Sequence, residues 1–351
     1  MGKINFSSDN LSFEAKLLYL REQLTGISTS VSLYKEVNVK CKPPLEFYEK
    51  LIISGWGDSV PISQIKIYYF NDKESKKSIL FKNQKLIKEK DALFTLGISE
   101  RENSIVFALS INHYLADEQT LKLVFNLIKI GTNYSMEKAI RDSKKMGENY
   151  IDYIKKQVEY SNSTNQIKNE FKPIKLSNEG FLSWNIQKDR ICVSREINSR
   201  VDIEKLLYYL LRILEEENTF SSGNIICSSK LWSSLYNYDC LGMVTGLIPI
   251  KISEYSFYSD EKKEVSLETK AYKSKYYKGI LDACISSELF INTSVARNIA
   301  SEYILDTSFP VGIEIDRIGE NVVNISFEGK FCSANSVEYI LDRIELILKG
   351  A

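Results

Sequence analysis

The sequence predicts an α+β protein with two comparable lobes, and three observations support this fold class. The chain has 351 residues, which is too long for one small core and fits two domains or lobes. Strand-like apolar segments mix with helical patterns in both halves. Residues 161–173 are polar, lack apolar periodicity and end in Pro173, which indicates a linker. We therefore expect an N-terminal lobe over residues 1–173 and a C-terminal lobe over residues 174–351.

The first lobe should open with a helix over residues 11–24. Its apolar residues recur at helical spacing, Ser12 suits its N-cap, and Gly26 suits its end. The later elements follow from the same two periodicities. Strands are expected at 28–39, 65–70, 78–81, 91–99 and 104–111, and helices at 45–54, 119–130 and 135–160.

The pattern restarts beyond the linker. Residues 201–216 form a strongly apolar helix. The other elements expected in this lobe are strands at 191–196, 224–228, 247–252, 309–315 and 322–327, and a terminal helix at 337–348. Each lobe thus combines strands with helices.

The composition excludes several classes of function. Lys and Arg number 46 together, as do Asp and Glu, whereas an obligate nucleic-acid partner usually demands a strongly basic surface. No stretch approaches the ~20 apolar residues of a transmembrane helix. The first nine residues lack the apolar core of a signal peptide. We therefore expect a cytoplasmic protein that binds neither nucleic acid nor a membrane, and either a discrete protein or a domain excised from a longer protein fits the sequence.

The cysteines do not indicate a metal site. None has C-x-x-C spacing, and the chain holds a single histidine to join them, so zinc is not expected. A catalytic cysteine is not expected either, because no second histidine exists to activate one. In a cytoplasmic chain they should be reduced, buried thiols. The six are Cys41, Cys192, Cys227, Cys240, Cys284 and Cys332.

The single histidine is the strongest functional signal. His113 follows the apolar run 104–111, and a carboxylate, Asp117, lies four residues further on. Imidazole is the side chain whose ordinary pKa suits acid-base chemistry near neutral pH. His113 is therefore the candidate catalytic residue. The alternative is a structural histidine at the end of a strand.

Residues 112–118, Asn-His-Tyr-Leu-Ala-Asp-Glu, resemble the His-His-x-x-x-Asp-Gly motif of nonribosomal peptide synthetase condensation domains. These domains belong to the chloramphenicol-acetyltransferase-like superfamily. His113 falls on the second His of the motif and Asp117 on its Asp. Residues 11–20 resemble the opening helix of the family, and residues 241–251 resemble its second-lobe stretch. The resemblance spans essentially the whole chain and implies two such lobes in a V-shaped arrangement with a central tunnel.

The resemblance also implies an activity. The family joins an acyl thioester on a carrier protein to an amine, or less often a hydroxyl, in nonribosomal peptide or related antibiotic biosynthesis. His113 would orient or deprotonate the acceptor, or stabilise the tetrahedral intermediate. Asp117 would anchor the motif through an ion pair with Lys230 or an arginine, and Asn112 and Glu118 would line the tunnel. The implied partners are acyl or peptidyl carrier proteins, which deliver substrates on phosphopantetheine to a monomeric chain that binds no cofactor itself.

Three departures from the family pattern keep other interpretations open. Asn112 replaces the first His, Glu118 replaces the Gly, and Lys230 stands where many members carry an Arg with a bidentate fork. The chain also looks abridged over 181–210 and 252–309. The alternatives are a catalytically inactive docking or recruitment module and an acyl-CoA-dependent acyltransferase for small molecules. The Glu118 carboxylate either attracts a cationic amine or points to solvent.

Overall fold

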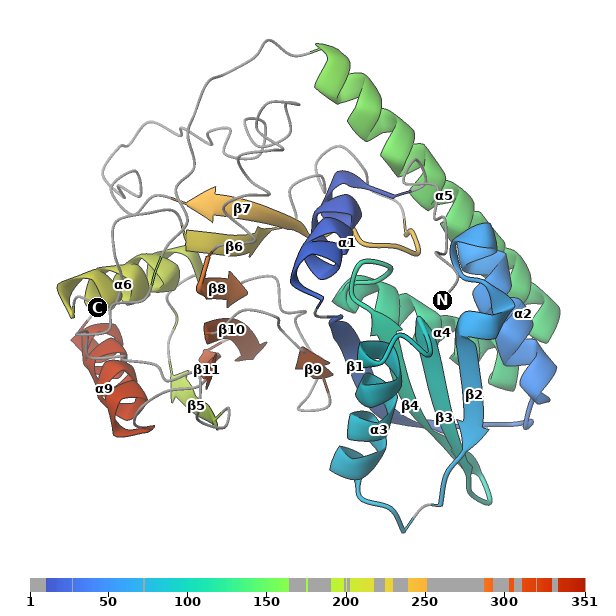
Figure 1. Cartoon of the computed structure of the whole chain (residues 1–351). Coiled ribbons are helices and arrows are strands. Elements are labelled where there is room, and N and C mark those ends of the chain that lie inside the picture. The colour runs from blue at the N-terminus through green and yellow to red at the C-terminus, as the bar shows by residue number, and fades with distance from the viewer. Residues whose placement is uncertain are drawn as a thin grey trace. The chain divides into compact units, whose positions relative to one another are not determined.

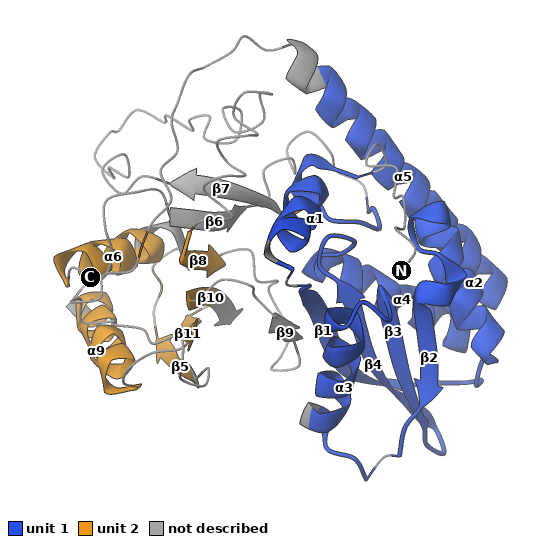
Figure 2. Cartoon of the chain, viewed as in Figure 1, with its two compact units in different colours: residues 1–163, 232–244, 299–308 blue, residues 164–231, 245–298, 309–351 orange. Residues whose placement is uncertain are grey.

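A computed structural model describes most of the first half of the chain and shorter parts of the second. The described residues are 11–163 without 27 and 72, then 175, 191–198, 200, 203–217, 225–229, 239–250, 287–292, 303–305, 311–319, 321–329 and 334–350. Their elements separate into two compact units (Figure 2). Unit 1 comprises residues 1–163, 232–244 and 299–308, and unit 2 comprises residues 164–231, 245–298 and 309–351. The predicted boundary at residue 173 lies outside the described residues. Both units mix helices with strands, so the predicted α+β class is confirmed.

Unit 1 is built around one mixed sheet (Figure 1). Its elements are α1 (Phe13–Thr25), β1 (Ser30–Asn38), α2 (Leu45–Trp56), the single turns η2 (Gly57–Ser59) and η3 (Ile62–Gln64), β2 (Ile65–Tyr69), α3 (Lys76–Lys88), β3 (Phe94–Glu100), β4 (Ser104–Asn112), α4 (Glu118–Asn133), α5 (Met136–Ser163) and β9 (Tyr303–Leu305). The strands lie in the order β2-β3-β4-β1-β9. β4 pairs antiparallel with both β1 and β3, and its last residue, Asn112, lies opposite Ser30.

The first helix begins and ends where its sequence indicates. The side-chain oxygen of Ser12 accepts a hydrogen bond from the Ala15 N–H at 3.1 Å, as an N-cap does. Gly26 ends the helix at a φ of 71°, a left-handed conformation that glycine adopts without a Cβ clash. The helix predicted over residues 11–24 is therefore confirmed.

Strand β4 is buried on both faces. Val106 and Ala108 pack with Ile79 and Leu80 of α3 on one face. On the other, the Phe107 ring meets the Tyr48 ring of α2 and the Phe125 ring of α4 edge to face, with centroids 5.8 and 6.1 Å apart. A continuous apolar run suits a strand covered on both sides. The packed strand ends at Asn112, so the residue that follows begins from a fixed point.

The strand predicted over residues 78–81 is wrong, because these residues lie inside α3. The Ser75 side chain accepts a hydrogen bond from the Ser78 N–H and caps the helix. Ile79, Asn83 and Ile87 recur every four residues and are buried on the sheet, whereas Phe81 is exposed. A short apolar run fits either period, and here the longer helical pattern prevails.

Helices α2 and α5 pack closely through two glycines. A Cβ atom added at Gly147 of α5 would lie 2.1 Å from the carbonyl oxygen of Gly55 in α2. The obstacle is backbone, so a rotamer change in a neighbouring side chain does not relieve it. A side chain at position 147 therefore requires the backbones of the two helices to move apart.

Replacing Gly147 with Ala is expected to lower the free energy of unfolding by about 1–3 kcal/mol, as overpacking of a core does. The better helix propensity of Ala returns only ~0.5–1 kcal/mol. Urea denaturation followed by circular dichroism measures the difference. Lys144→Ala, on the exposed side of the same helix, is the control and should change stability by less than ~0.5 kcal/mol. A Gly147→Ala variant as stable as the wild type would contradict the close contact.

A buried carboxylate joins α1 to α5. Glu14 accepts hydrogen bonds from Gln157 Nε2 at 2.9 and 2.8 Å and from the Tyr153 hydroxyl at 3.1 Å. Burial raises the pKa of Glu14 to about 7, although these hydrogen bonds partly oppose the rise. The folded chain therefore binds a proton at pH values where the unfolded chain has released it.

Stability should consequently fall as pH rises from about 4.5 to about 7, the ordinary and the raised pKa of Glu14. The stabilisation from protonated Glu14 is fully present below pH 4.5 and is lost above a pH of about 7. Glu14→Gln removes this titration, so its unfolding free energy should fall less over the same range, by on the order of 2 kcal/mol. Denaturant unfolding at pH 4.5, 6 and 8 makes the comparison. Parallel profiles for wild type and variant would refute the assignment.

Unit 2 contains a second sheet, covered on one face by two helices. Its elements are β5 (Ile191–Asn198), α6 (Ile203–Glu216), β6 (Ile225–Ser229), β7 (Gly246–Ile250), β8 (Leu289–Asn292), β10 (Val311–Gly319), β11 (Val322–Gly329) and α9 (Ala334–Gly350). The described strands lie in the order β5-β11-β10-β8-β6-β7. Val323, Ile325 and Phe327 of β11 alternate with less buried neighbours, as expected when one face is covered.

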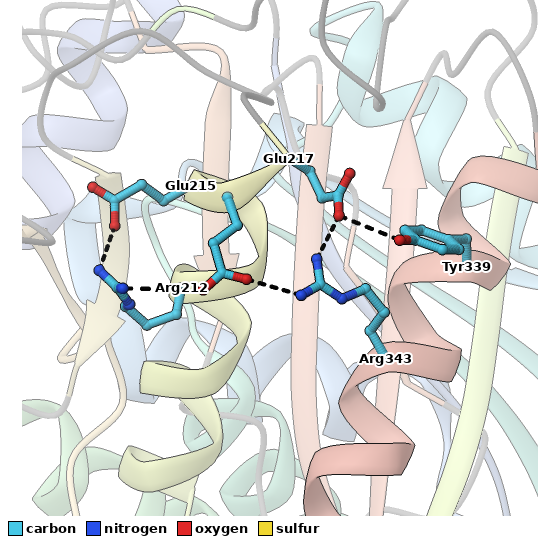
Figure 3. A network of polar contacts seen from close by, with 6 residues as sticks. Arg212, Glu215, Glu217, Tyr339 and Arg343 are labelled. Carbon is cyan, nitrogen blue, oxygen red and sulfur yellow. Dashed lines mark hydrogen bonds and ion pairs between the residues drawn. The ribbon is translucent and has the colours of Figure 1, made fainter.

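Ion pairs and apolar packing both connect α6 to α9. Arg343 of α9 pairs with Glu216 at 2.8 Å and with Glu217, and the Tyr339 hydroxyl donates to Glu217 at 3.5 Å (Figure 3). Arg212 pairs with the neighbouring Glu215 at 3.0 Å. Ion pairs this exposed contribute ~0–1 kcal/mol each. The buried apolar faces therefore supply most of the attachment; they include Leu206, Leu210, Ile340, Leu341 and Ile344.

The elements predicted for the second lobe are confirmed where they fall within the described residues, but two strands were not predicted. β8 has four residues and β9 has three, too few for an alternating pattern to emerge. The predicted burial of the cysteines holds for Cys240 and is wrong for Cys41 and Cys192, which are exposed. Cys41 lies in the turn after β1, and Cys192 lies on the edge strand β5. The Cys284 and Cys332 residues and the Cys227 side chain lie outside the described part. No helix in the described ranges is long and apolar enough to cross a membrane.

Candidate active site

The candidate site centres on a turn that joins β4 to α4, residues 112–117, called here the His113 turn. His113 follows the last residue of β4 and is half-buried. Its backbone N–H donates to the Thr29 carbonyl oxygen, just before β1, at 2.9 Å. Its ring atom Nδ1 lies 3.0 Å from the Ala116 carbonyl oxygen. Both the backbone and the imidazole of His113 are therefore held.

The contact with Ala116 determines which ring nitrogen carries the proton. A carbonyl oxygen only accepts hydrogen bonds, so Nδ1 must be the donor. In the neutral ring the basic lone pair then lies on Nε2. A histidine in this tautomer has the form required of a general base.

Asn112 holds the beginning of the turn. Its Nδ2 donates to Glu22 Oε2 at 3.0 Å, and its Oδ1 accepts from the Tyr114 backbone N–H at 3.1 Å. The side chain is 1% exposed. The amide therefore links α1 to the His113 turn, while its predicted place along a tunnel stays a prediction.

Glu22 is a site residue that the sequence prediction missed. Its other oxygen, Oε1, accepts from the Ser28 hydroxyl at 2.7 Å. The carboxylate is buried, and burial raises its pKa above the ordinary value against the effect of the Ser28 and Asn112 hydrogen bonds. Glu22 lies in the last turn of α1, where the helix dipole disfavours a negative charge. That unfavourable position is the signal that could have singled it out.

Asp117 anchors the other end of the turn. Its Oδ1 accepts from the Thr120 N–H at 2.9 Å, which caps α4, and its Oδ2 accepts from the Val244 N–H at 3.2 Å. The residue is 3% exposed. Lys230 lies outside the described residues, so its ion pair with Asp117 stays a prediction.

Residues 239–244, called here the 239–244 segment, are bound to the turn and to neighbouring helices. The Thr120 hydroxyl donates to the Gly242 carbonyl oxygen at 2.6 Å and accepts from the Gly242 N–H at 3.1 Å. The Ser12 hydroxyl donates to the Met243 carbonyl oxygen at 2.7 Å. A Cβ atom at Gly242 would lie 2.3 Å from the Tyr150 ring, so the segment runs close to α5. Sequence reasoning did not identify the Thr120 contact, which spans more than a hundred residues.

Glu118 is the first residue of α4 and is 7% exposed. The interpretation that its side chain points to solvent is therefore wrong. The N-terminus of a helix favours a negative charge, which reduces the cost of burying this carboxylate. Within the described residues no three His, Cys, Asp or Glu side chains gather as metal ligands would.

Comparisons with known proteins are informative for structure alone. No family model and no curated protein matches this chain. Among solved structures, the epimerization domain from the third module of tyrocidine synthetase B aligns with a TM-score of 0.56 at 11% identity, covering 97% of this chain and 96% of that one. A mutant of the starter condensation domain of rhizomide synthetase aligns with a TM-score of 0.56 at 9% identity, over 97% and 96% of the two chains.

A second mutant of that starter domain, in complex with C8-CoA and Leu-SNAC, aligns with a TM-score of 0.54 at 9% identity. It covers 97% of this chain and 94% of that one. The likeness therefore runs along nearly the whole length of each protein. At these identities it establishes the fold and leaves the chemistry to the residues. The chain has the fold of the condensation and epimerization domains of nonribosomal peptide synthetases.

Proposed function

We propose that this chain is a condensation-type acyltransferase of nonribosomal peptide or related biosynthesis. It forms an amide, or an ester, between an acyl group on a carrier protein and an amine or hydroxyl acceptor. One observation carries the proposal: the single histidine follows a fully buried strand, and Ala116 fixes the tautomer that leaves Nε2 basic. The fold supports it, because solved proteins of this fold include condensation domains.

The reaction needs one group that accepts and returns a proton. The acceptor nitrogen attacks the thioester carbonyl carbon, a C–N bond forms, and the carbonyl oxygen takes the negative charge. His113 Nε2 takes the proton from the attacking nitrogen. The intermediate then expels the sulfur, the C–S bond breaks, and the histidine returns the proton to the thiolate. The products are an amide and the free thiol of the phosphopantetheine arm.

The residues around His113 position it in this proposal. Asp117, together with Lys230, anchors the turn, and Asn112 ties it to α1. Glu118 borders the substrate path in the predicted tunnel of the V-shaped arrangement, where its carboxylate attracts a cationic amine. Acyl or peptidyl carrier proteins present the substrates, so the chain itself needs no resident cofactor.

Two other reactions are candidates for a protein with this fold and a single histidine. One solved neighbour is bound to C8-CoA, which motivates an acyl-CoA-dependent acyltransferase as the second candidate. Another is an epimerization domain, in which the product would be an inverted stereocentre rather than a new bond. The departures at Asn112 and Glu118 motivate a fourth candidate, a docking module without chemistry.

One panel of assays separates these candidates. Acyl groups are offered on phosphopantetheinylated carrier proteins and, in parallel, on CoA, with carrier-bound amines and free amines as acceptors. Intact-protein mass spectrometry detects transfer, and chiral chromatography of the hydrolysed acyl group detects inversion. Transfer from carrier to amine supports the proposal. Transfer from CoA alone, inversion without transfer, or carrier binding without either would each replace it with the corresponding alternative.

A further inference from the structure

One carboxylate contacts both chain segments that hold His113. Glu22 Oε1 accepts from the hydroxyl of Ser28, which precedes the residue whose carbonyl binds the His113 N–H. Glu22 Oε2 accepts from the amide of Asn112, which precedes His113 itself. Ser28 lies just before β1 and Asn112 is the last residue of β4, so the two segments are far apart in sequence. Glu22 therefore fixes the spacing of the two segments at the point where His113 begins.

The hydrogen-bond roles in this contact are fully determined. Asn112 Oδ1 accepts from the Tyr114 N–H, so its Nδ2 must be the group that faces Glu22. The ionised carboxylate is acceptor-only and matches two donors. Two titratable groups interact electrostatically with Glu22 among the described contacts. The positive charge of Lys90 favours the ionised carboxylate, and burial together with the Glu22 charge raises the pKa of the Tyr114 hydroxyl.

We infer that Glu22 is a positioning residue for His113, which acts through Asn112 and Ser28 to hold the turn in the geometry that places a proton on Nδ1. The inference rests on the proposed function only for its effect on catalysis. Its effect on the imidazole is independent of any activity. The contact between His113 Nδ1 and the Ala116 carbonyl oxygen lies within the His113 turn. It therefore depends on the position of Asn112, the first residue of that turn.

The contact can be broken and rebuilt by exchanging donor and acceptor. Asn112→Asp alone sets two buried carboxylates against each other, which repel. Adding Glu22→Gln restores a complementary pair: the new amide at position 22 donates to the new carboxylate at position 112 and accepts from Ser28. The Tyr114 N–H still meets an oxygen. Asn126→Asp, at an exposed position of α4, adds the same charge and serves as the control.

The single histidine makes a direct readout possible, because a histidine-labelled sample gives nitrogen signals from His113 alone. We expect the wild type and the control to show the tautomer protonated at Nδ1 in a long-range proton–nitrogen spectrum. Asn112→Asp should show a mixed or averaged tautomer, and Asn112→Asp with Glu22→Gln should return to the wild-type pattern. Transfer by Asn112→Asp should fall about 10²-fold in kcat with little change in KM, as for a misplaced catalytic group, and the double variant should recover most of it.

An unaltered tautomer in Asn112→Asp, or no recovery in the double variant, overturns the inference. If Asn112→Asp does not fold, recovery of folding and of the tautomer in the double variant supports the contact, and failure to recover overturns it. The proposed function can fail separately. In that case the spectra follow the expected order while the wild type transfers no acyl group.

Discussion

Replacing His113 with Ala is expected to lower kcat for acyl transfer by about 10²–10⁴-fold, the usual contribution of a general base. The loss should be large because the sequence holds no second histidine to substitute for it. Substrate binding does not depend on the proton transfer, so KM for the acyl donor should change much less. Initial rates at several donor concentrations, with the amide product quantified by chromatography, measure both parameters.

The His113→Ala variant should remain folded, which separates lost chemistry from lost structure. The substitution keeps the backbone hydrogen bond to Thr29 and removes the ring contact to Ala116, worth ~0.5–1.5 kcal/mol. Circular dichroism and thermal unfolding test this. Lys85→Ala, on the exposed surface of α3, is the control for an unrelated substitution. A folded His113→Ala variant with the wild-type rate would remove the histidine from the mechanism.

Replacing Asp117 with Ala should lower the free energy of unfolding by about 2–5 kcal/mol and reduce transfer as well. The loss of the α4 cap accounts for ~0.5–2 kcal/mol. The loss of a charged acceptor from the Val244 N–H accounts for a further ~1.5–3 kcal/mol. Transfer falls because the His113 turn and the 239–244 segment lose their shared attachment. Denaturant unfolding and the transfer assay measure the two effects on the same preparation.

The Asp117→Ser variant separates the contribution of the α4 cap from that of the Val244 contact. Serine is a good N-cap, so the bond to the Thr120 N–H is retained, while the second oxygen that Val244 requires is gone. This variant should lie between the wild type and Asp117→Ala in stability. Equal stability of Asp117→Ser and the wild type would show that the Val244 contact contributes nothing.

The parts of the fold that could be predicted have strong local signals. The helix capped by Ser12 has a long periodic run with clear ends, and the antiparallel pair β3 and β4 has two long apolar runs separated by a polar turn. The strand prediction for residues 78–81 was wrong because four apolar or small residues fit the period of a strand and that of a helix equally well. The cap at Ser75 and the burial of Ile87 favour the helix. Strands β8 and β9 are stabilised by their neighbours in the sheet rather than by a pattern of their own.

The candidate site also contains residues that could be predicted from the sequence and residues that could not. His113 and Asp117 could be found because they lie four residues apart in one segment. Their partners could not, because the contacts with Glu22, Thr120 and Val244 depend on tertiary packing between segments far apart in sequence. Glu22 alone carried a local anomaly, a carboxylate in the last turn of a helix, where the helix dipole disfavours a negative charge.

The measurement that tests the proposed chemistry most directly is a single-turnover transfer between two loaded carrier proteins, followed by intact-protein mass spectrometry. With the wild type, the acceptor carrier should gain the mass of the acyl group while the donor carrier loses it. With His113→Ala, the exchange should be slower by at least about 10²-fold. Equal rates with the two proteins, or no exchange with either across the panel of donors and acceptors, would contradict a condensing enzyme centred on His113.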